Sequence, residues 1–240
     1  MICRLCNNDK TLGKSHVIPE SFFPKIKNAP RPLKLLTNVA GEFPKKAQIG
    51  VYDKTILCTE CEKTFDLPDN YAQKLLLEYQ NQHIPVSDSF QSIGYKIQNY
   101  DYDLLKLFFV SLLWRASISS HSFYEGIRLG PFESVAFNLL KANQSIPSEV
   151  FSVILAKFDD PVGKSILDPF ASKFDGVNFN VFYLGGYVAY IKSDKRNTPN
   201  IFSELMMSPG RPLLIFSREL SDSPEISLFR DIVRTSYKRA

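Results

Sequence analysis

Apolar residues recur at helical spacing in the middle of the chain. Seven of them lie three or four positions apart, which predicts a strongly apolar helix at the centre of the fold: Leu104, Leu105, Phe108, Phe109, Leu112, Leu113 and Ala116. Trp114 and Arg115 lie on the same helix. A second helix is expected over residues 132–143, after Gly130 and Pro131.

The pattern changes toward the end of the chain. Residues 149–158, 179–184, 187–192 and 212–217 are rich in β-branched and aromatic side chains, which favour strands. Gly185 and Gly186 between two of these segments indicate a tight hairpin. We expect a small antiparallel sheet, with a helix over residues 224–238 packed across it.

A composition shift near Pro68 predicts two units in an α+β chain. Residues 1–68 contain a strand around His16, a long loop over 19–46, a strand over 49–57 and a helix starting near Cys61. Residues 69–240 form a mixed α/β domain, helical over 70–145, with the sheet and the last helix over 146–240.

The chain has 240 residues, 44% of them hydrophobic and 22% charged, as in packed proteins. No run approaches the roughly 20 apolar residues that cross a bilayer, and the start lacks the apolar core of a signal peptide. We therefore expect a cytoplasmic protein without membrane contact. Dinucleotide-binding, P-loop and serine-hydrolase motifs do not occur.

The cysteines occur as two C-x2-C pairs, Cys3 with Cys6 and Cys58 with Cys61. Disulfides are rare in the cytosol, whereas paired thiolates at this spacing complete a tetrahedral zinc site. All four ligands come from the protein, so the Zn²⁺ is expected to be structural rather than catalytic. The alternative is four unpaired core cysteines.

Positive charge concentrates in the same part of the chain. Residues 1–63 hold 11 Lys and Arg against 6 Asp and Glu, while the other 177 hold 18 against 19. Basic side chains in irregular segments can meet phosphates, although they can equally be a solvated surface. The candidates for nucleic-acid binding are Lys10, Lys14, Lys45, Lys46 and Lys54.

Ser15-His16-Val17-Ile18-Pro19 follows the first cysteine pair, Asp53 lies five residues before Cys58, and Glu62 follows Cys61. With the two cysteine pairs, this motif resembles the HNH nucleases of the ββα-metal group. The resemblance covers roughly the first 66 residues. It implies a zinc-stapled treble-clef, or ββα-metal, module that binds DNA and hydrolyses phosphodiester bonds.

The resemblance also implies roles for single residues. His16 matches the general base, Asp53 matches the residue that orients it, and Glu62 matches a ligand of a catalytic Mg²⁺ or Mn²⁺. Asp66 lies four residues after Glu62, so on one helix the two carboxylates share a face. Ser15 replaces the usual acidic or His ligand. Ser15, Glu62 and Asp66 are the candidate ligands of the catalytic ion, although a neutral hydroxyl binds divalent cations poorly without a charged neighbour.

Two hypotheses follow. The first is a metal-dependent HNH-like endonuclease, associated by family with bacterial anti-phage defence. The second is a zinc-stabilised module that binds nucleic acid or protein without cleaving, as the Ser15 substitution favours. Residues 69–240 are expected to position substrate, bind a protein partner or restrain the nuclease. His83 and His121 lack metal-ligand spacing and are expected to be structural or exposed.

Overall fold

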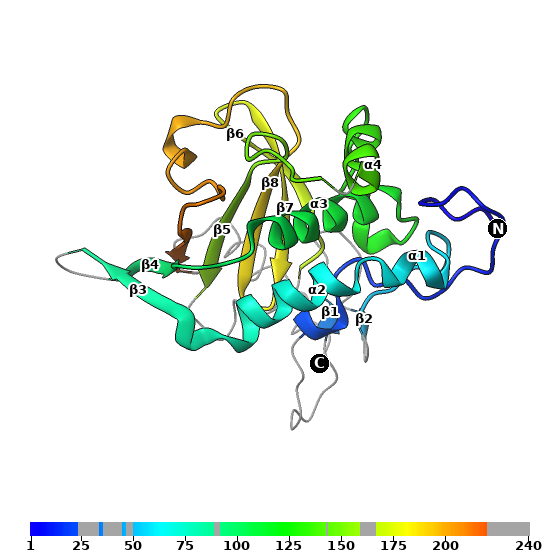
Figure 1. The fold of residues 1–240 in the computed structure, drawn as a ribbon, viewed down its shortest axis with the longest axis horizontal. Helices are drawn as coiled ribbons and strands as arrows, with labels where there is room; N and C mark the ends of the chain where they lie inside the picture. The colour runs from blue at the N-terminus through cyan, green and yellow to red at the C-terminus, as the bar shows by residue number, and fades with distance from the viewer. Residues whose placement is uncertain are drawn as a thin grey trace, which may run out of the picture.

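The computed structural model describes residues 1–23, 34–35, 45–46, 50–88, 92–142, 144–158 and 167–219. In these segments the chain is a mixed α+β fold with four α-helices and a seven-stranded sheet (Figure 1). The helices are α1 (Thr59–Lys63), α2 (Asp66–Gln73), α3 (Tyr102–Ile118) and α4 (Phe132–Ala142). The strands of the large sheet are β3 (His83–Ser87), β4 (Ser92–Ile97), β5 (Val153–Phe158), β6 (Phe170–Phe174), β7 (Val177–Leu184), β8 (Tyr187–Lys192) and β9 (Leu213–Arg218).

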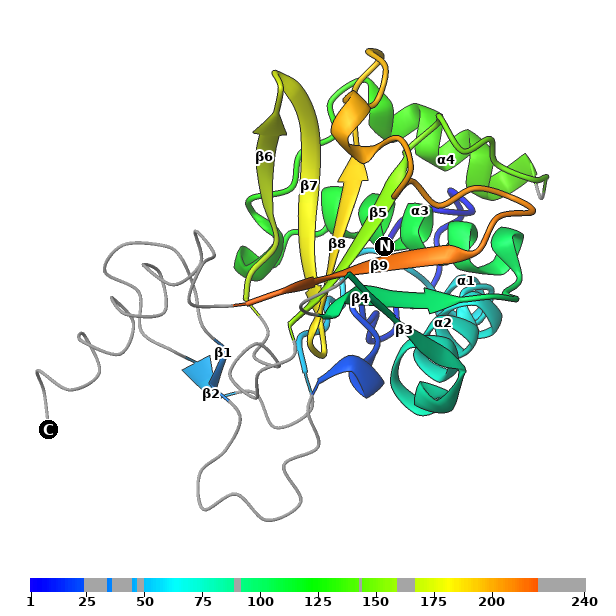
Figure 2. The same ribbon diagram turned by 90° about the vertical axis from the view of Figure 1, so that its left-hand side faces the viewer.

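The large sheet has the order β3-β4-β9-β5-β8-β7-β6 (Figure 2). Five neighbouring pairs are antiparallel, and β5 and β9 are parallel. The expected small antiparallel sheet is therefore larger and mixed. The difference arises because β3 and β4, from a region expected to be helical, join the later strands through β9. The helix expected over 224–238 lies outside the described residues.

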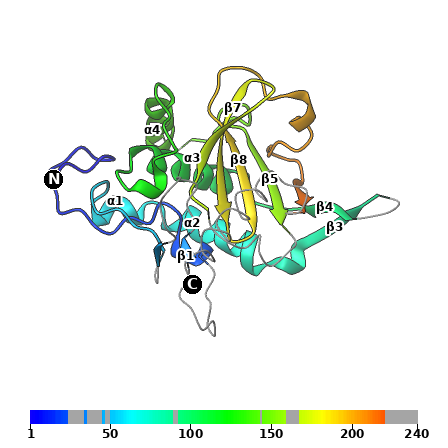
Figure 3. The same cartoon turned by 180° about the vertical axis from the view of Figure 1, so that it is seen from behind.

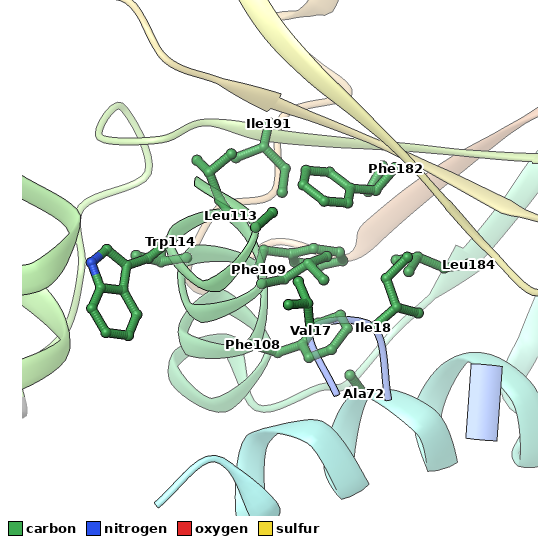
Figure 4. Packing of buried hydrophobic residues seen from close by; sticks show 14 of the residues in the cluster. Val17, Ile18, Ala72, Phe108, Phe109, Leu113, Trp114, Phe182, Leu184 and Ile191 are labelled. Atoms are coloured by element: carbon green, nitrogen blue, oxygen red, sulfur yellow. The ribbon is translucent and has the colours of Figure 1, made fainter. Parts of the chain in front are cut away.

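Helix α3 is the centre of the fold. Asp101 caps its start by accepting a hydrogen bond of 3.0 Å from the Leu104 N–H, and nearly every side chain on the helix is buried. Figure 4 shows α3 between the sheet, which contributes Phe182 and Ile191, and the N-terminal segment with Val17. The apolar helix predicted from the sequence is confirmed, as is the α4 segment against which Trp114 packs.

The opposite face of the sheet carries a second apolar cluster. Phe179, Val181 and Tyr190 belong to it, and Phe202 from the short 3₁₀ helix η6 (Asn200–Phe202) packs on it. Inward and outward side chains of β7 therefore enter different clusters, as strand alternation requires. The four helices gather on the other side of the sheet (Figure 2).

The boundary expected after residue 68 falls inside α2. Helix α2 continues through Pro68 into a π-helical turn, η2 (Lys74–Glu78), and a 3₁₀ turn, η3 (Gln80–Gln82), before β3 begins. Residues on both sides share one buried cluster, which runs from Cys3 to Ile215. His83 begins β3 and is buried, with its Nε2 2.9 Å from the Leu75 carbonyl oxygen.

The N-terminal segment runs along the side of the helices, at the opposite end of the molecule from the β3–β4 hairpin (Figures 1 and 3). The strands expected around His16 and over 49–57 meet only through isolated bridges, Ser15 with Asp53 and Leu12 with Cys58. Phe22 belongs to the 3₁₀ turn η1 (Glu20–Phe22) and is buried. Backbone alone is described for the pair β1 (Lys34–Leu35) and β2 (Lys45–Lys46).

Candidate functional site

The four cysteines meet at one point. Their Sγ atoms all lie within 4.8 Å of one another. Four sulfurs about 2.3 Å from one tetrahedral ion are roughly 3.8 Å apart, so this cluster is close to the spacing that a metal requires. Cys3 and Cys6 flank a turn, Cys58 precedes α1, and Cys61 lies within α1. The cluster can therefore hold a structural metal ion.

The surroundings of Cys3 also suit a metal-bound thiolate. Burial opposes ionisation, but the N–H groups of Cys6 and Cys58 lower the pKa of Cys3 to about 6. The Cys58 N–H lies 3.3 Å from the Cys3 sulfur. Burial and the neighbouring sulfurs raise the pKa of Cys61 well above its ordinary value. A bound cation removes this conflict because it stabilises all four thiolates together.

Glu62 joins the first helix to the segment that carries His16. The Ser15 hydroxyl donates a hydrogen bond to one carboxylate oxygen, and the His16 N–H donates to the other at 3.2 Å. Burial raises the pKa of Glu62, while the Arg115 charge and these donors oppose that rise. Ser15 is itself fixed by backbone hydrogen bonds of 2.7 and 2.8 Å with Asp53.

His16 has a ring nitrogen available for chemistry. Its Nε2 atom is buried and has no hydrogen-bond partner among the described residues. The ring contacts Tyr52 edge to face, with 5.8 Å between ring centroids. An imidazole nitrogen without a protein partner can take or give a proton when a ligand or water reaches it.

His16 opens onto an acidic cavity of about 440 Å³. The chain breaks its helix at Thr64 and Phe65, so Glu62 and Asp66 lie on two short helices rather than on one. Both still line this cavity. The complete lining is Lys14, His16, Pro19, Glu20, Ser21, Glu62, Asp66, Asp69, Asn70 and Gln73.

The carboxylates of the cavity do not form a ready-made metal cage. Among the described residues, the four cysteines are the only group of three or more His, Cys, Asp or Glu side chains placed closely enough to hold a metal ion. Asp69 also lines the cavity, but both of its oxygens accept hydrogen bonds from Arg115. A divalent cation held by Glu62 and Asp66 would therefore need further oxygen ligands from water or from a bound phosphate.

Asp53 faces the end of α3. Its carboxylate accepts hydrogen bonds from the Thr55 N–H and hydroxyl at 2.7 and 2.6 Å and from the Ser119 hydroxyl at 2.7 Å. The Ser120 N–H donates to it at 2.9 Å. The sequence predicts that Asp53 orients the His16 ring, whereas every hydrogen bond shown for this carboxylate goes to Thr55, Ser119 or Ser120.

Two of the predicted lysines lie against Tyr52, and one of them, Lys14, also lines the cavity. The Nζ atoms of Lys14 and Lys54 lie 5.2 and 5.7 Å from the centroid of the Tyr52 ring, within cation–π range. Lys10 instead forms an ion pair with Glu60. The side chains of Lys45 and Lys46 lie outside the described residues.

The sequence patterns did not single out Tyr52, Asp69 or Arg115 as site residues. Asp69 and Tyr52 carry no local signal of this role. Arg115 does carry one, because a charged residue inside an apolar helix is expected to have a buried partner. The structure places its guanidinium behind the cavity, fully buried.

Comparison with known proteins identifies no relative, since no family model, no curated protein and no solved structure matches the chain. None of the helices in the described part of the chain has the length and apolar character of a membrane span.

Proposed function

We propose that this protein is a metal-dependent endonuclease of the HNH type that hydrolyses DNA phosphodiester bonds. One observation carries the proposal: His16, whose Nε2 is buried and has no hydrogen-bond partner among the described residues, lines the same cavity as Glu62 and Asp66. This combines a base and two carboxylates in one recess. The four-cysteine cluster lies beside it, because Glu62 directly follows Cys61.

In this proposal His16 accepts the proton of the water that attacks phosphorus. Glu62 and Asp66 would hold a Mg²⁺ or Mn²⁺, and this ion would neutralise the scissile phosphate and stabilise the leaving oxygen. The hydrogen bond from the His16 N–H to Glu62 holds the proposed base close to the proposed metal ligand. Asp53 fixes the backbone of Ser15, and so the position of the base, through main-chain hydrogen bonds.

We propose that the cysteines hold Zn²⁺ in a treble-clef arrangement. The first pair lies in a turn and the second pair at the start of a helix. A tetrahedral ion there links the start of the chain to α1, which carries Glu62. Zinc is thus structural in this proposal, and it positions one wall of the cavity.

The DNA is proposed to approach over Lys14, Lys54 and Tyr52. The carboxylates of the cavity repel phosphate. A polyanion therefore binds only if the lysines beside Tyr52 and a bound divalent cation offset this negative charge. We place this activity in the bacterial cytoplasm, and family association alone suggests anti-phage defence. A protein partner would bind through residues 69–240.

Plasmid nicking tests the proposal. Purified protein with its bound zinc is incubated with supercoiled DNA and Mg²⁺ or Mn²⁺, and nicked product is followed over time. We expect His16→Ala to abolish nicking while it keeps zinc content and thermal stability, and His121→Ala to nick as the parent does. Nicking that persists in His16→Ala would contradict His16 as the base.

A second candidate function is a binding module that does not cleave. The observation that favours it is the engagement of Glu62, whose two oxygens already accept hydrogen bonds from Ser15 and His16. Such a module binds DNA with a steep dependence on salt, because lysines rather than the imidazole make the contacts. It predicts full binding and no cleavage for both the parent protein and His16→Ala.

A further inference from the structure

Arg115 connects three parts of the molecule. It lies in α3, almost 100 residues after His16, and its side chain is fully buried. One terminal nitrogen donates to the His16 carbonyl oxygen at 3.0 Å. The two terminal nitrogens donate to the two oxygens of Asp69 at 2.9 and 2.7 Å. The guanidinium thereby links α3 to the His16 segment and to α2.

All five N–H groups of this guanidinium are used. The other two donate to Ser111, one to its carbonyl at 3.3 Å and one to its hydroxyl at 3.2 Å. The Phe65 ring lies against the guanidinium, 4.8 Å from its carbon to the ring centroid. A planar group with five fixed donors and a ring on its face has one orientation, so it fixes the groups that it contacts.

A contribution to stability alone does not explain such a pair. A buried ion pair loses hydration on both partners, and replacing the whole pair by apolar residues is often neutral or stabilising. The contacts instead lie at the cavity. His16 and Asp69 both line it, and Asp69 is on α2, which also carries Asp66. The structural result of the pair is a fixed position of His16 relative to α2.

We propose that Arg115 is a positioning residue for the reaction at His16, so that helix α3 is part of the active centre. This inference rests on the proposed function. Arg115 binds His16 through the main-chain carbonyl oxygen and acts through this contact. It thereby fixes the position of the imidazole relative to the carboxylates of α1 and α2. The proposed DNA contacts are the exposed side chains of Lys14 and Lys54, so we expect DNA affinity to depend little on Arg115.

Arg115→Lys tests the proposal, because lysine keeps the charge but cannot bond two carboxylate oxygens and the His16 carbonyl together. A displacement of about 1 Å at a catalytic group can cost about 100-fold in rate. We expect the single-turnover cleavage rate to fall about 100-fold, with DNA affinity and zinc content unchanged within about threefold. A merely structural residue would lower all three together.

Ser111→Ala is the matched control. It removes one contact of the same guanidinium, to a side chain that is not in the cavity lining, and keeps the contact to the Ser111 carbonyl, so we expect it to cleave within about threefold of the parent. A parent rate retained in Arg115→Lys would overturn the inference and leave the nuclease proposal intact. If Arg115→Lys loses zinc or fails to fold, Asp69→Asn, whose side chain is 16% exposed, is judged by the same criteria.

Failure of the parent to cleave would overturn the proposed function itself. Hydrogen exchange of the amides in residues 15–18 then decides the positional claim, because it needs no activity. Faster exchange in Arg115→Lys, but not in Ser111→Ala, supports a fixed His16 segment. Equal exchange in the parent and both variants overturns it.

Discussion

The hydroxyl of Ser119 donates a 2.7 Å hydrogen bond to the carboxylate of Asp53, 66 residues earlier in the chain. This bond ties the end of α3 to the strand bridge that holds Ser15. Although burial opposes ionisation, the donors Thr55, Ser119 and Ser120 lower the pKa of Asp53 below its ordinary value. The charged carboxylate is therefore a structural acceptor.

Replacement of Asp53 by Asn should destabilise the fold. The amide leaves buried donors unsatisfied, so we expect a loss of about 1–3 kcal/mol in the free energy of unfolding at neutral pH. The pKa of Asp53 is lowered by folding, so its contribution is present above pH ~4 and declines as the pH falls through the folded value. Urea titrations at pH 7 and pH 3 measure this. An equal difference between parent and variant at both pH values would refute the linkage.

The metal site can be tested at its most accessible ligand. Cys6 is half-buried, so its substitution leaves little cavity. We expect Cys6→Ser to reduce bound zinc from about one ion per chain to a small fraction, and to lower the melting temperature, because metal binding contributes to folding. Cys6→His, which keeps a zinc ligand, should retain the ion. Metal analysis of both variants measures the number of zinc ions per chain. About one ion per chain in Cys6→Ser would argue against a site at the four cysteines.

The substitution Ser15→Asp creates two adjacent carboxylates. Ser15 is buried and its hydroxyl donates to Glu62, so an Asp there loses the donor and adds a like charge. Without divalent ions we expect the melting temperature to fall by about 3 °C or more, and to recover when Mn²⁺ is added. Ser21→Asp, in the same cavity lining, serves as the control. A variant that melts like the parent with and without Mn²⁺ would exclude an ion at Glu62.

The surface around Tyr52 can be tested by charge removal. We expect Lys14→Gln combined with Lys54→Gln to weaken DNA binding and to reduce the slope of log affinity against log salt by about 2, since each phosphate contact contributes about 0.9. Lys173→Gln, on the edge strand β6, should bind as the parent does. Fluorescence anisotropy at several salt concentrations provides the slopes, and an unchanged slope would place the DNA elsewhere.

Lys106 gives a pH-dependent stability. It is fully buried on α3, and its ammonium donates to the Phe151 carbonyl at 2.9 Å. Burial lowers its pKa to about 7, so above this pH the unfolded state holds the extra proton and stability rises with pH. From pH 7 to pH 9 we expect the free energy of unfolding to rise more in the parent than in Lys106→Met, by about 1 kcal/mol or more. Lys141 is exposed, so the stability of Lys141→Met should depend on pH as that of the parent does. If Lys106→Met also showed the parent's pH dependence, the folded lysine would be charged and the prediction would be wrong.

Local patterns predicted the elements that are regular in sequence. The apolar spacing of α3, the glycine pair between β7 and β8 and the spacing of the four cysteines all act over short stretches of chain. Sheet order depends on distant pairing, so the placement of β9 beside both β4 and β5 had no local signal.

The candidate site shows the same division. The motif predicts His16 and Glu62, and the spacing from Glu62 predicts Asp66; the structure places all three around one cavity, although Glu62 and Asp66 lie on two helices rather than one. Apart from the local donor Thr55, the hydrogen-bond partners of Asp53 and the partner of the His16 carbonyl come from α3 and the residues after it, which only folding brings near. Spacing along a chain cannot predict such contacts.

The interior position of β9 sets a condition on synthesis. Among the described strands of the sheet it is the last in sequence, yet it separates the β3–β4 hairpin from β5 and its neighbours. A chain still emerging from the ribosome therefore holds two sheet fragments with open edges until residue 218 is released. During that interval, unpaired backbone groups on β4 and β5 are exposed to other nascent chains, so chaperone dependence should end only when β9 has paired.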